Sequence, residues 1–122
     1  MNDLKVISVD DTLMNLILIE EIAREMGVYV ESFQDPLEAL KHIKNSRVDM
    51  MFVDYMMPQM NGLDALPKLL EVNPKAKVLM MTAYSTLDKV LNAHRHGASD
   101  YIMKPFSSLD ALGTKIKEVL KK

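Results

Sequence analysis

The sequence contains no cysteine and no tryptophan, and only four glycines and five prolines among 122 residues. Without cysteine there can be no disulfide framework, no thiol nucleophile and no thiolate zinc site. No apolar run approaches the roughly 18 residues of a membrane span, and no signal-peptide pattern opens the chain. A net charge of -2 provides no global basic field that would attract nucleic acid. We therefore expect a cytoplasmic protein without direct nucleic-acid or membrane contact.

The remaining composition is typical of a globular domain. Apolar residues make up 48% of the chain and charged residues 26%. A chain of this length can bury a core without disulfides. The eleven methionines are explained by their use as adaptable core side chains. We expect one domain over residues 1–122.

Short apolar runs alternate with segments whose apolar residues recur at helical spacing. The runs lie at residues 6–9, 28–33, 50–53, 78–81 and 101–103. The helical positions that follow them are Leu16, Ile19, Ala23 and Met26; Leu37, Leu40 and Ile43; Leu63, Leu66 and Leu70; Leu87, Val90, Leu91 and His94; and Leu109, Leu112, Ile116 and Val119. Continuous apolar strands indicate burial on both faces, as in a parallel sheet covered by helices. With right-handed crossovers, the pattern predicts a doubly wound α/β sandwich.

Polar residues stand where four of these strands end. They are Asp10 and Asp11 after the first strand, Asp54 after the third, Thr82 after the fourth and Lys104 after the fifth. In open parallel sheets the functional crevice lies outside the carboxyl ends of the strands. The sequence therefore predicts three carboxylates, a hydroxyl and an ammonium group on one rim.

Three carboxylates in one crevice repel each other, and a divalent cation would relieve this repulsion. Oxygen ligands favour a hard ion, and Mg²⁺ typically joins one or two carboxylates to phosphate oxygens. A carboxylate beside Mg²⁺ can attack phosphorus and form an aspartyl phosphate. Lys104 and Thr82 would supply a positive charge and a hydrogen-bond donor for the transferring group. Each residue alone is better explained as a cap or a solvated loop residue, whereas the combination predicts phosphoryl transfer to an aspartate.

Four segments together resemble the receiver domain of two-component response regulators, the CheY-like superfamily. They are Val-Asp-Asp at 9–11, Asp-Tyr-Met-Met-Pro at 54–58 leading to Gly62, Met-Thr-Ala at 81–83, and Gly-Ala-Ser-Asp-Tyr-Ile-Met-Lys-Pro-Phe at 97–106. The resemblance covers essentially the whole chain. It implies a flavodoxin-like fold with strand order 2-1-3-4-5. It also implies a signalling phosphoacceptor that assists its own phosphorylation and dephosphorylation, and not an enzyme.

The resemblance assigns the residues of the reaction. It implies that Asp54 is the phosphoacceptor and that Asp11 binds Mg²⁺ directly, with Mn²⁺ able to substitute. Asp10 would bind the ion mostly through water, and Met56 would add its backbone carbonyl. Lys104 would pair with the phosphoryl oxygens.

The resemblance also implies a switch. Thr82 would move toward the phosphoryl group and Tyr101 would turn inward, which alters the surface of the fourth helix, fifth strand and fifth helix. Pro105 would follow a cis peptide bond that directs the preceding lysine into the crevice. Met56 and Tyr84 occupy positions where this family tunes dephosphorylation, and we expect their bulk to slow attack by water.

The resemblance further implies partners. A histidine kinase or histidine phosphotransfer protein would dock near the crevice and the first helix, where Asn15 lies within reach. A downstream effector protein or domain would read the switch, and the chain would be a monomer or a phosphorylation-dependent dimer.

The sequence is less consistent with three other functions. A receiver-like module that no longer uses phosphate would not need the intact Asp11, Asp54, Thr82 and Lys104. A phosphatase of the haloacid dehalogenase type requires a second aspartate two positions after its nucleophile, and Thr12 stands at that distance from Asp10. A Rossmann nucleotide-binding turn requires glycines, which residues 10–13 lack.

Overall fold

The structure, a computed structural model, describes residues 4–55, 57–58, 60–82, 95, 97–103 and 109–121. For residues 109–111, 120 and 121 only the backbone is described. The predicted fourth helix, based on residues 87–94, lies outside the described residues.

Five parallel strands form one sheet in the order β2-β1-β3-β4-β5. The strands are β1 (Val6–Val9), β2 (Val30–Phe33), β3 (Met50–Asp54), β4 (Lys77–Thr82) and β5 (Asp100–Met103). The predicted strand order 2-1-3-4-5 is thereby confirmed. The second strand is two residues shorter at its start than predicted, and Tyr29, just before it, is 77% exposed.

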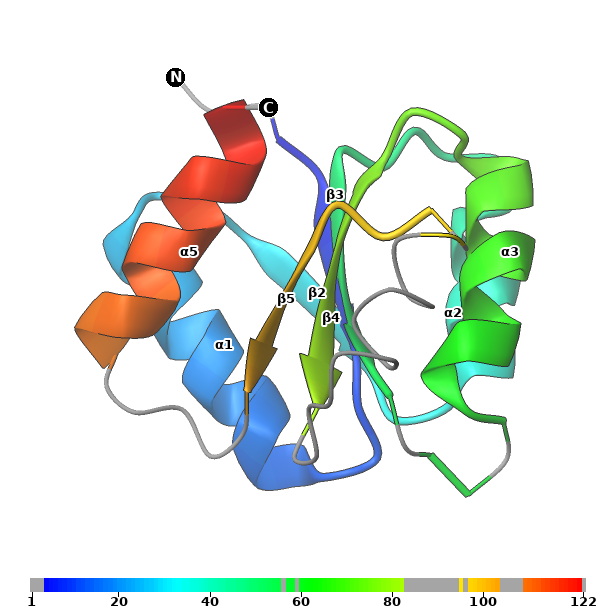
Figure 1. The fold of residues 1–122 in the computed structure, drawn as a ribbon, viewed down its shortest axis with the longest axis horizontal. Helices are drawn as coiled ribbons and strands as arrows, with labels where there is room; N and C mark the ends of the chain where they lie inside the picture. The colour runs from blue at the N-terminus through cyan, green and yellow to red at the C-terminus, as the bar shows by residue number, and fades with distance from the viewer. Residues whose placement is uncertain are drawn as a thin grey trace.

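Helices cover both faces of the sheet (Figure 1). One face carries α1 (Leu13–Glu25) and α5 (Leu109–Lys121), and the other carries α2 (Pro36–Ile43) and α3 (Gly62–Val72). Each face buries its own apolar cluster, one against α2 and α3 and the other against α1 and α5. This arrangement confirms the doubly wound α/β sandwich.

The described parts of β1, β3 and β4 are almost completely buried, as their continuous apolar runs predicted. The edge strand β5 differs, because its residues are half-buried or exposed. An edge strand has a neighbour on one side only, so its apolar run is less covered than those of the central strands.

Local signals fix the helix ends. Gly27 follows α1 with φ of 76°, a conformation that glycine adopts without strain. The Asp35 side chain accepts a hydrogen bond of 2.9 Å from the backbone N–H of Leu37, and Pro36 occupies the first helical position of α2. Asn61 caps α3 in the same way, accepting from the N–H of Asp64 at 2.9 Å.

The spacing of Leu37, Leu40 and Ile43 predicts that all three face the core, but Leu37 is 48% exposed. The buried stripe of this helix consists of Pro36, Ala39 and Ile43. Leu37 lies one position beyond Pro36, about 100° around the helix axis, so its side chain leaves the sheet face. Leu40 packs against the core only in part.

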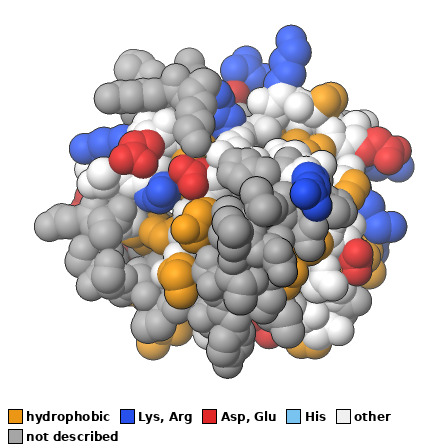
Figure 2. Space-filling model, in the orientation of Figure 1, with side chains coloured by type: hydrophobic (Ala, Val, Ile, Leu, Met, Phe, Trp, Pro, Cys, Tyr) orange, Lys and Arg blue, Asp and Glu red, His pale blue; other side chains and the backbone are white. Residues whose placement is uncertain are grey.

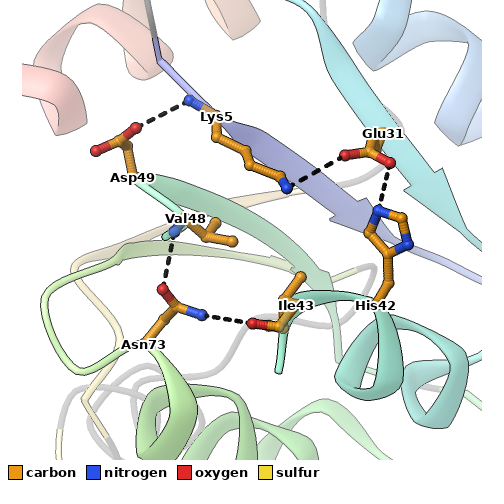
Figure 3. Close-up of polar contacts among 7 residues, drawn as sticks. All are labelled: Lys5, Glu31, His42, Ile43, Val48, Asp49 and Asn73. Atoms are coloured by element: carbon orange, nitrogen blue, oxygen red, sulfur yellow. Dashed lines mark hydrogen bonds and ion pairs between the residues drawn. The ribbon is translucent and has the colours of Figure 1, made fainter. Parts of the chain in front are cut away.

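Hydrogen bonds tie the loops at the amino ends of the strands (Figure 3). The buried Asn73 side chain accepts from the backbone N–H of Val48 at 2.8 Å and donates to the carbonyl of Ile43 at 3.4 Å. The loop after α3 is thereby fastened to the loop between α2 and β3.

A second set of polar contacts lies beside it (Figure 3). The backbone N–H of Lys5 donates to the Asp49 carboxylate at 2.9 Å, and the Lys5 ammonium lies 3.8 Å from Glu31. His42 Nε2 lies 2.7 Å from the same Glu31 carboxylate. These contacts join the starts of β1 and β3 to β2 and α2.

Charged side chains of both signs are interspersed over the described part of the face in Figure 2. Among the described residues, no helix is both long enough and apolar enough to cross a membrane.

Candidate functional site

The predicted carboxylates meet at the carboxyl edge of the sheet. Asp10 and Asp11 follow β1, and Asp54 ends β3, the strand beside it. One carboxylate oxygen from each residue lies within 4.8 Å of the other two. Asp10 is fully buried, Asp54 is 3% exposed and Asp11 is half-buried. The rule that places functional residues at strand ends thus predicted this cluster correctly.

The chemistry of this cluster fits a hard cation. Burying carboxylate charge is costly unless another charge or hydrogen bonds compensate it. Three carboxylates this close also repel each other, and a divalent ion with oxygen ligands relieves that repulsion. Asp10, Asp11 and Asp54 are therefore residues that could hold a metal ion.

Backbone contacts fix Asp10. Its N–H donates to the carbonyl of Phe33 at 3.0 Å, which extends the β1–β2 ladder by one residue. Its Oδ1 accepts a hydrogen bond of 2.9 Å from the N–H of Thr12, so the side chain is held by the turn that leads into α1.

The end of β3 is held from two sides. The N–H of Tyr55 donates to the carbonyl of Met81 in β4 at 2.8 Å, and the Tyr55 carbonyl accepts from the N–H of Gly62 at 2.7 Å. The chain around Asp54 is therefore fixed by both the neighbouring strand and the start of α3.

Thr82 and Tyr101 lie on the next two strands of the sheet, β4 and β5. Thr82 ends β4, is 5% exposed, and belongs to the strand that adjoins β3. Tyr101 is half-buried in β5 and packs against the apolar cluster on the α2–α3 face. The backbone N–H of Tyr101 donates to the Asp100 carboxylate at 2.8 Å, and Lys115 of α5 lies 3.4 Å from that carboxylate.

Four predicted site residues lie outside the described residues: Met56, Tyr84, Lys104 and Pro105. The structure therefore brings together Asp10, Asp11 and Asp54, with Thr82 at the same edge of the sheet.

Two further residues touch this site, and the sequence assigned a role in it to neither. Gln34, at the end of β2, donates its side-chain amide to the backbone carbonyl of Asp11 at 3.2 Å. Gly62 packs against the end of β3. Gly62 could have been found, because it belongs to the segment beginning at Asp54 that resembles the receiver domain. No sequence pattern distinguishes Gln34.

The model of the response regulator receiver domain family matches residues 6–117. The chain belongs to this family. Receiver domains are signalling phosphoacceptor domains that interact with histidine kinases and effectors.

Relatives with different architectures share this domain. The chain is 34% identical to the chemotaxis protein CheY of Listeria monocytogenes over 106 residues, which cover 86% of this chain and 89% of CheY. It is 37% identical to the DNA-binding transcriptional regulator NtrC of Proteus hauseri over 97 residues, covering 80% of this chain but 20% of NtrC. The chain thus spans about a fifth of the length of that regulator.

A solved structure confirms the fold. The CheY-like receiver domain protein of Methanospirillum hungatei superimposes with a TM-score of 0.88 at 31% identity. The match covers 97% of this chain and 94% of that one.

Proposed function

We propose that this chain is a phosphorylation-activated switch in which Asp54 accepts a phosphoryl group from a phosphohistidine. The proposal rests chiefly on one observation, the three carboxylate oxygens within 4.8 Å of each other at the carboxyl edge of the sheet. The donor would be a histidine kinase or a histidine phosphotransfer protein.

The acidic cluster would hold Mg²⁺, with Asp11 as a direct ligand and Asp10 bound mostly through water. The Met56 carbonyl would complete the protein ligands. When bound, the ion neutralises negative charge on the carboxylates and on the transferring phosphoryl oxygens.

The Asp54 carboxylate performs the bond-forming step. One of its oxygens attacks phosphorus in line with the imidazole nitrogen of the donor. The new O–P bond forms as the N–P bond breaks, and the electron pair stays on the imidazole nitrogen, which then takes a proton. Lys104 and the Thr82 hydroxyl at the end of β4 would stabilise the phosphoryl oxygens.

The response would pass through β4 and β5. Thr82 moves toward the charged phosphoryl group, and the half-buried Tyr101 takes the space that it leaves. To move a two-state equilibrium from 1:99 to 99:1 requires roughly 5.5 kcal/mol of differential interaction. The phosphorylated side chain carries a charge of about -1.5 to -2 in place of the -1 of the free carboxylate, and this added charge and its new acceptor oxygens would be the source of that difference.

Three exposed apolar side chains support a docking surface on α1, near the carboxylates. Leu13 is 58% exposed, Met14 is 63% exposed and Ile17 is 47% exposed, all in the first two turns. Large apolar side chains gathered on one exposed face mark an interaction site more often than isolated ones do. A donor protein bound there, next to Asn15, would bring its phosphohistidine to Asp54.

Intact mass measurement tests the chemistry. The chain is incubated with acetyl phosphate in Mg²⁺ or in EDTA, together with Asp54→Ala and a control, Asp64→Ala, which removes an exposed carboxylate of α3. We expect one labile phosphoryl group on the wild type and on the control, only with Mg²⁺, and none on Asp54→Ala.

The opposite result would favour a phosphate-independent interaction module. In that case the wild type would form no adduct, although amide chemical shifts confirm that it binds Mg²⁺. Beryllofluoride, which mimics the phosphoryl group, would exclude rapid loss of the adduct as the explanation.

A further inference from the structure

The three carboxylates of the cluster are not held equally. Asp10 has a backbone ladder bond to Phe33 and a side-chain bond from Thr12. Asp54 belongs to a buried strand. Asp11 lies in the bend between β1 and α1, and among the described residues its one hydrogen bond comes from the Gln34 side chain.

Gln34 is well placed to hold this bend because its own backbone is fixed on both sides. Phe33 before it pairs with Val9 at the end of β2. Asp35 after it caps α2, and Pro36 is buried at the first helical position. The amide of Gln34 therefore reaches the Asp11 carbonyl from a firm turn 23 residues away in the sequence.

We propose that Gln34 is a positioning residue for the cation site, acting through the backbone of Asp11. This inference rests on the proposed function, in which Asp11 is a direct ligand. Without this hydrogen bond, the bend that carries Asp11 samples more conformations in the metal-free protein. Ordering the bend when the ion binds then costs more free energy, so Mg²⁺ binds more weakly. Because the Gln34 side chain is exposed, we expect its replacement to affect the ligand and not the fold.

The test replaces Gln34 by methionine, which has a similar length and no amide donor. Mg²⁺ affinity is measured from amide chemical shifts of ¹⁵N-labelled protein near residues 10–12 and 54–55, and the unfolding temperature is measured in EDTA. The matched control is Asn45→Met, which removes an exposed amide at the opposite end of the sheet. Asp11→Asn serves as the reference for a lost ligand.

We expect Gln34→Met to weaken Mg²⁺ binding about threefold to tenfold, the range for one neutral hydrogen bond. The unfolding temperature in EDTA stays at the wild-type value, and Asn45→Met changes neither quantity. The inference is overturned if Gln34→Met binds Mg²⁺ within twofold of the wild-type affinity. It is also overturned if the affinity falls together with the unfolding temperature in EDTA, because the substitution would then have destabilised the fold.

Failure of the proposed function looks different. If the wild type itself shows no Mg²⁺-dependent shifts near the cluster, or if Asp11→Asn binds Mg²⁺ as well as the wild type does, then the cation site is wrong. If both behave as proposed and Gln34→Met is unchanged, only the role of Gln34 is wrong.

Discussion

A methyl group added to Gly62 would lie 2.4 Å from the backbone carbonyl oxygen of Asp54. It would also lie 3.0 Å from the Cα of Tyr55. The first residue of α3 is thus pressed against the end of β3, where the proposed phosphoacceptor stands. Both of these atoms belong to the backbone, so they cannot move aside as a flexible side chain would.

We predict that Gly62→Ala destabilises the fold and disturbs the site. Overpacking of this kind lowers the free energy of unfolding by about 1 to 3 kcal/mol. Because the displaced backbone carries Asp54, the yield of phosphoprotein with acetyl phosphate also falls at temperatures where the variant is folded. Denaturant unfolding and intact mass measure the two effects.

Gly113→Ala is the matched control in α5. The added carbon would meet the Ile22 side chain at 3.6 and 3.7 Å, which is ordinary contact. Alanine favours a helix interior over glycine by about 0.5 to 1 kcal/mol, so this variant is expected to be more stable than wild type. Equal destabilisation of both variants would contradict the close approach at Gly62.

Replacing Asn73 by alanine is predicted to lower stability without changing the site. The substitution leaves the N–H of Val48 and the carbonyl of Ile43 without the bonds that the amide makes. The Val48 N–H loses this partner, whereas the Ile43 carbonyl still accepts from the N–H of Ser46 at 3.0 Å, so the expected cost is about 1 to 3 kcal/mol in unfolding free energy. Phosphoryl uptake by the folded variant stays normal, because Asn73 lies at the amino end of the strands.

The exposed Asn45, in the same region, provides the comparison for this measurement. Asn45→Ala should change the unfolding free energy by less than about 0.5 kcal/mol. A loss for Asn73→Ala no larger than that would show that the buried amide contributes little.

Asp11→Asn is predicted to raise stability in EDTA and to remove the stabilisation by Mg²⁺. Neutralising one of three neighbouring carboxylates relieves repulsion worth roughly 1 kcal/mol. The wild type gains about 2.7 kcal/mol when the ion is present at a hundred times its Kd, and the variant gains little of this. Thermal unfolding with and without Mg²⁺ gives both numbers.

Glu21→Gln removes the same charge from an exposed position on α1 and is the control. It should leave the response to Mg²⁺ unchanged. If it raised stability in EDTA as much as Asp11→Asn does, the effect would come from net charge and not from the cluster.

Ile17→Asp is predicted to separate the two kinds of phosphoryl donor. The side chain is exposed, so folding and uptake from acetyl phosphate are expected to match the wild type. The donor is the histidine kinase, from a panel of purified kinases, that phosphorylates the wild type fastest. Transfer from this kinase is expected to slow at least tenfold, because a charge at the centre of the docking interface would oppose binding. Equal transfer rates for both proteins would exclude this face of α1 as the docking surface.

The layered fold and the residues of the acidic cluster follow from the order of residues along the chain. The continuous apolar runs require a covered parallel sheet, and the ends of its parallel strands must share one edge. The positions of Asp10, Asp11 and Asp54 at strand ends therefore predict that the three carboxylates lie together. The ends of α1 and α2 at Gly27 and Asp35 likewise depend on local residue types.

The side chains that hold this site in place are instead set by the packing of helices and strands against each other. Gln34 meets Asp11, and Asn73 meets Val48, across 23 and 25 residues of sequence, and neither contact leaves a periodic pattern. The exposure of Leu37 depends on how α2 is rotated against the sheet, and the closeness of Gly62 to Asp54 depends on where α3 begins. Such contacts arise from the packing of whole elements, whereas period and strand order are set by burial along each segment.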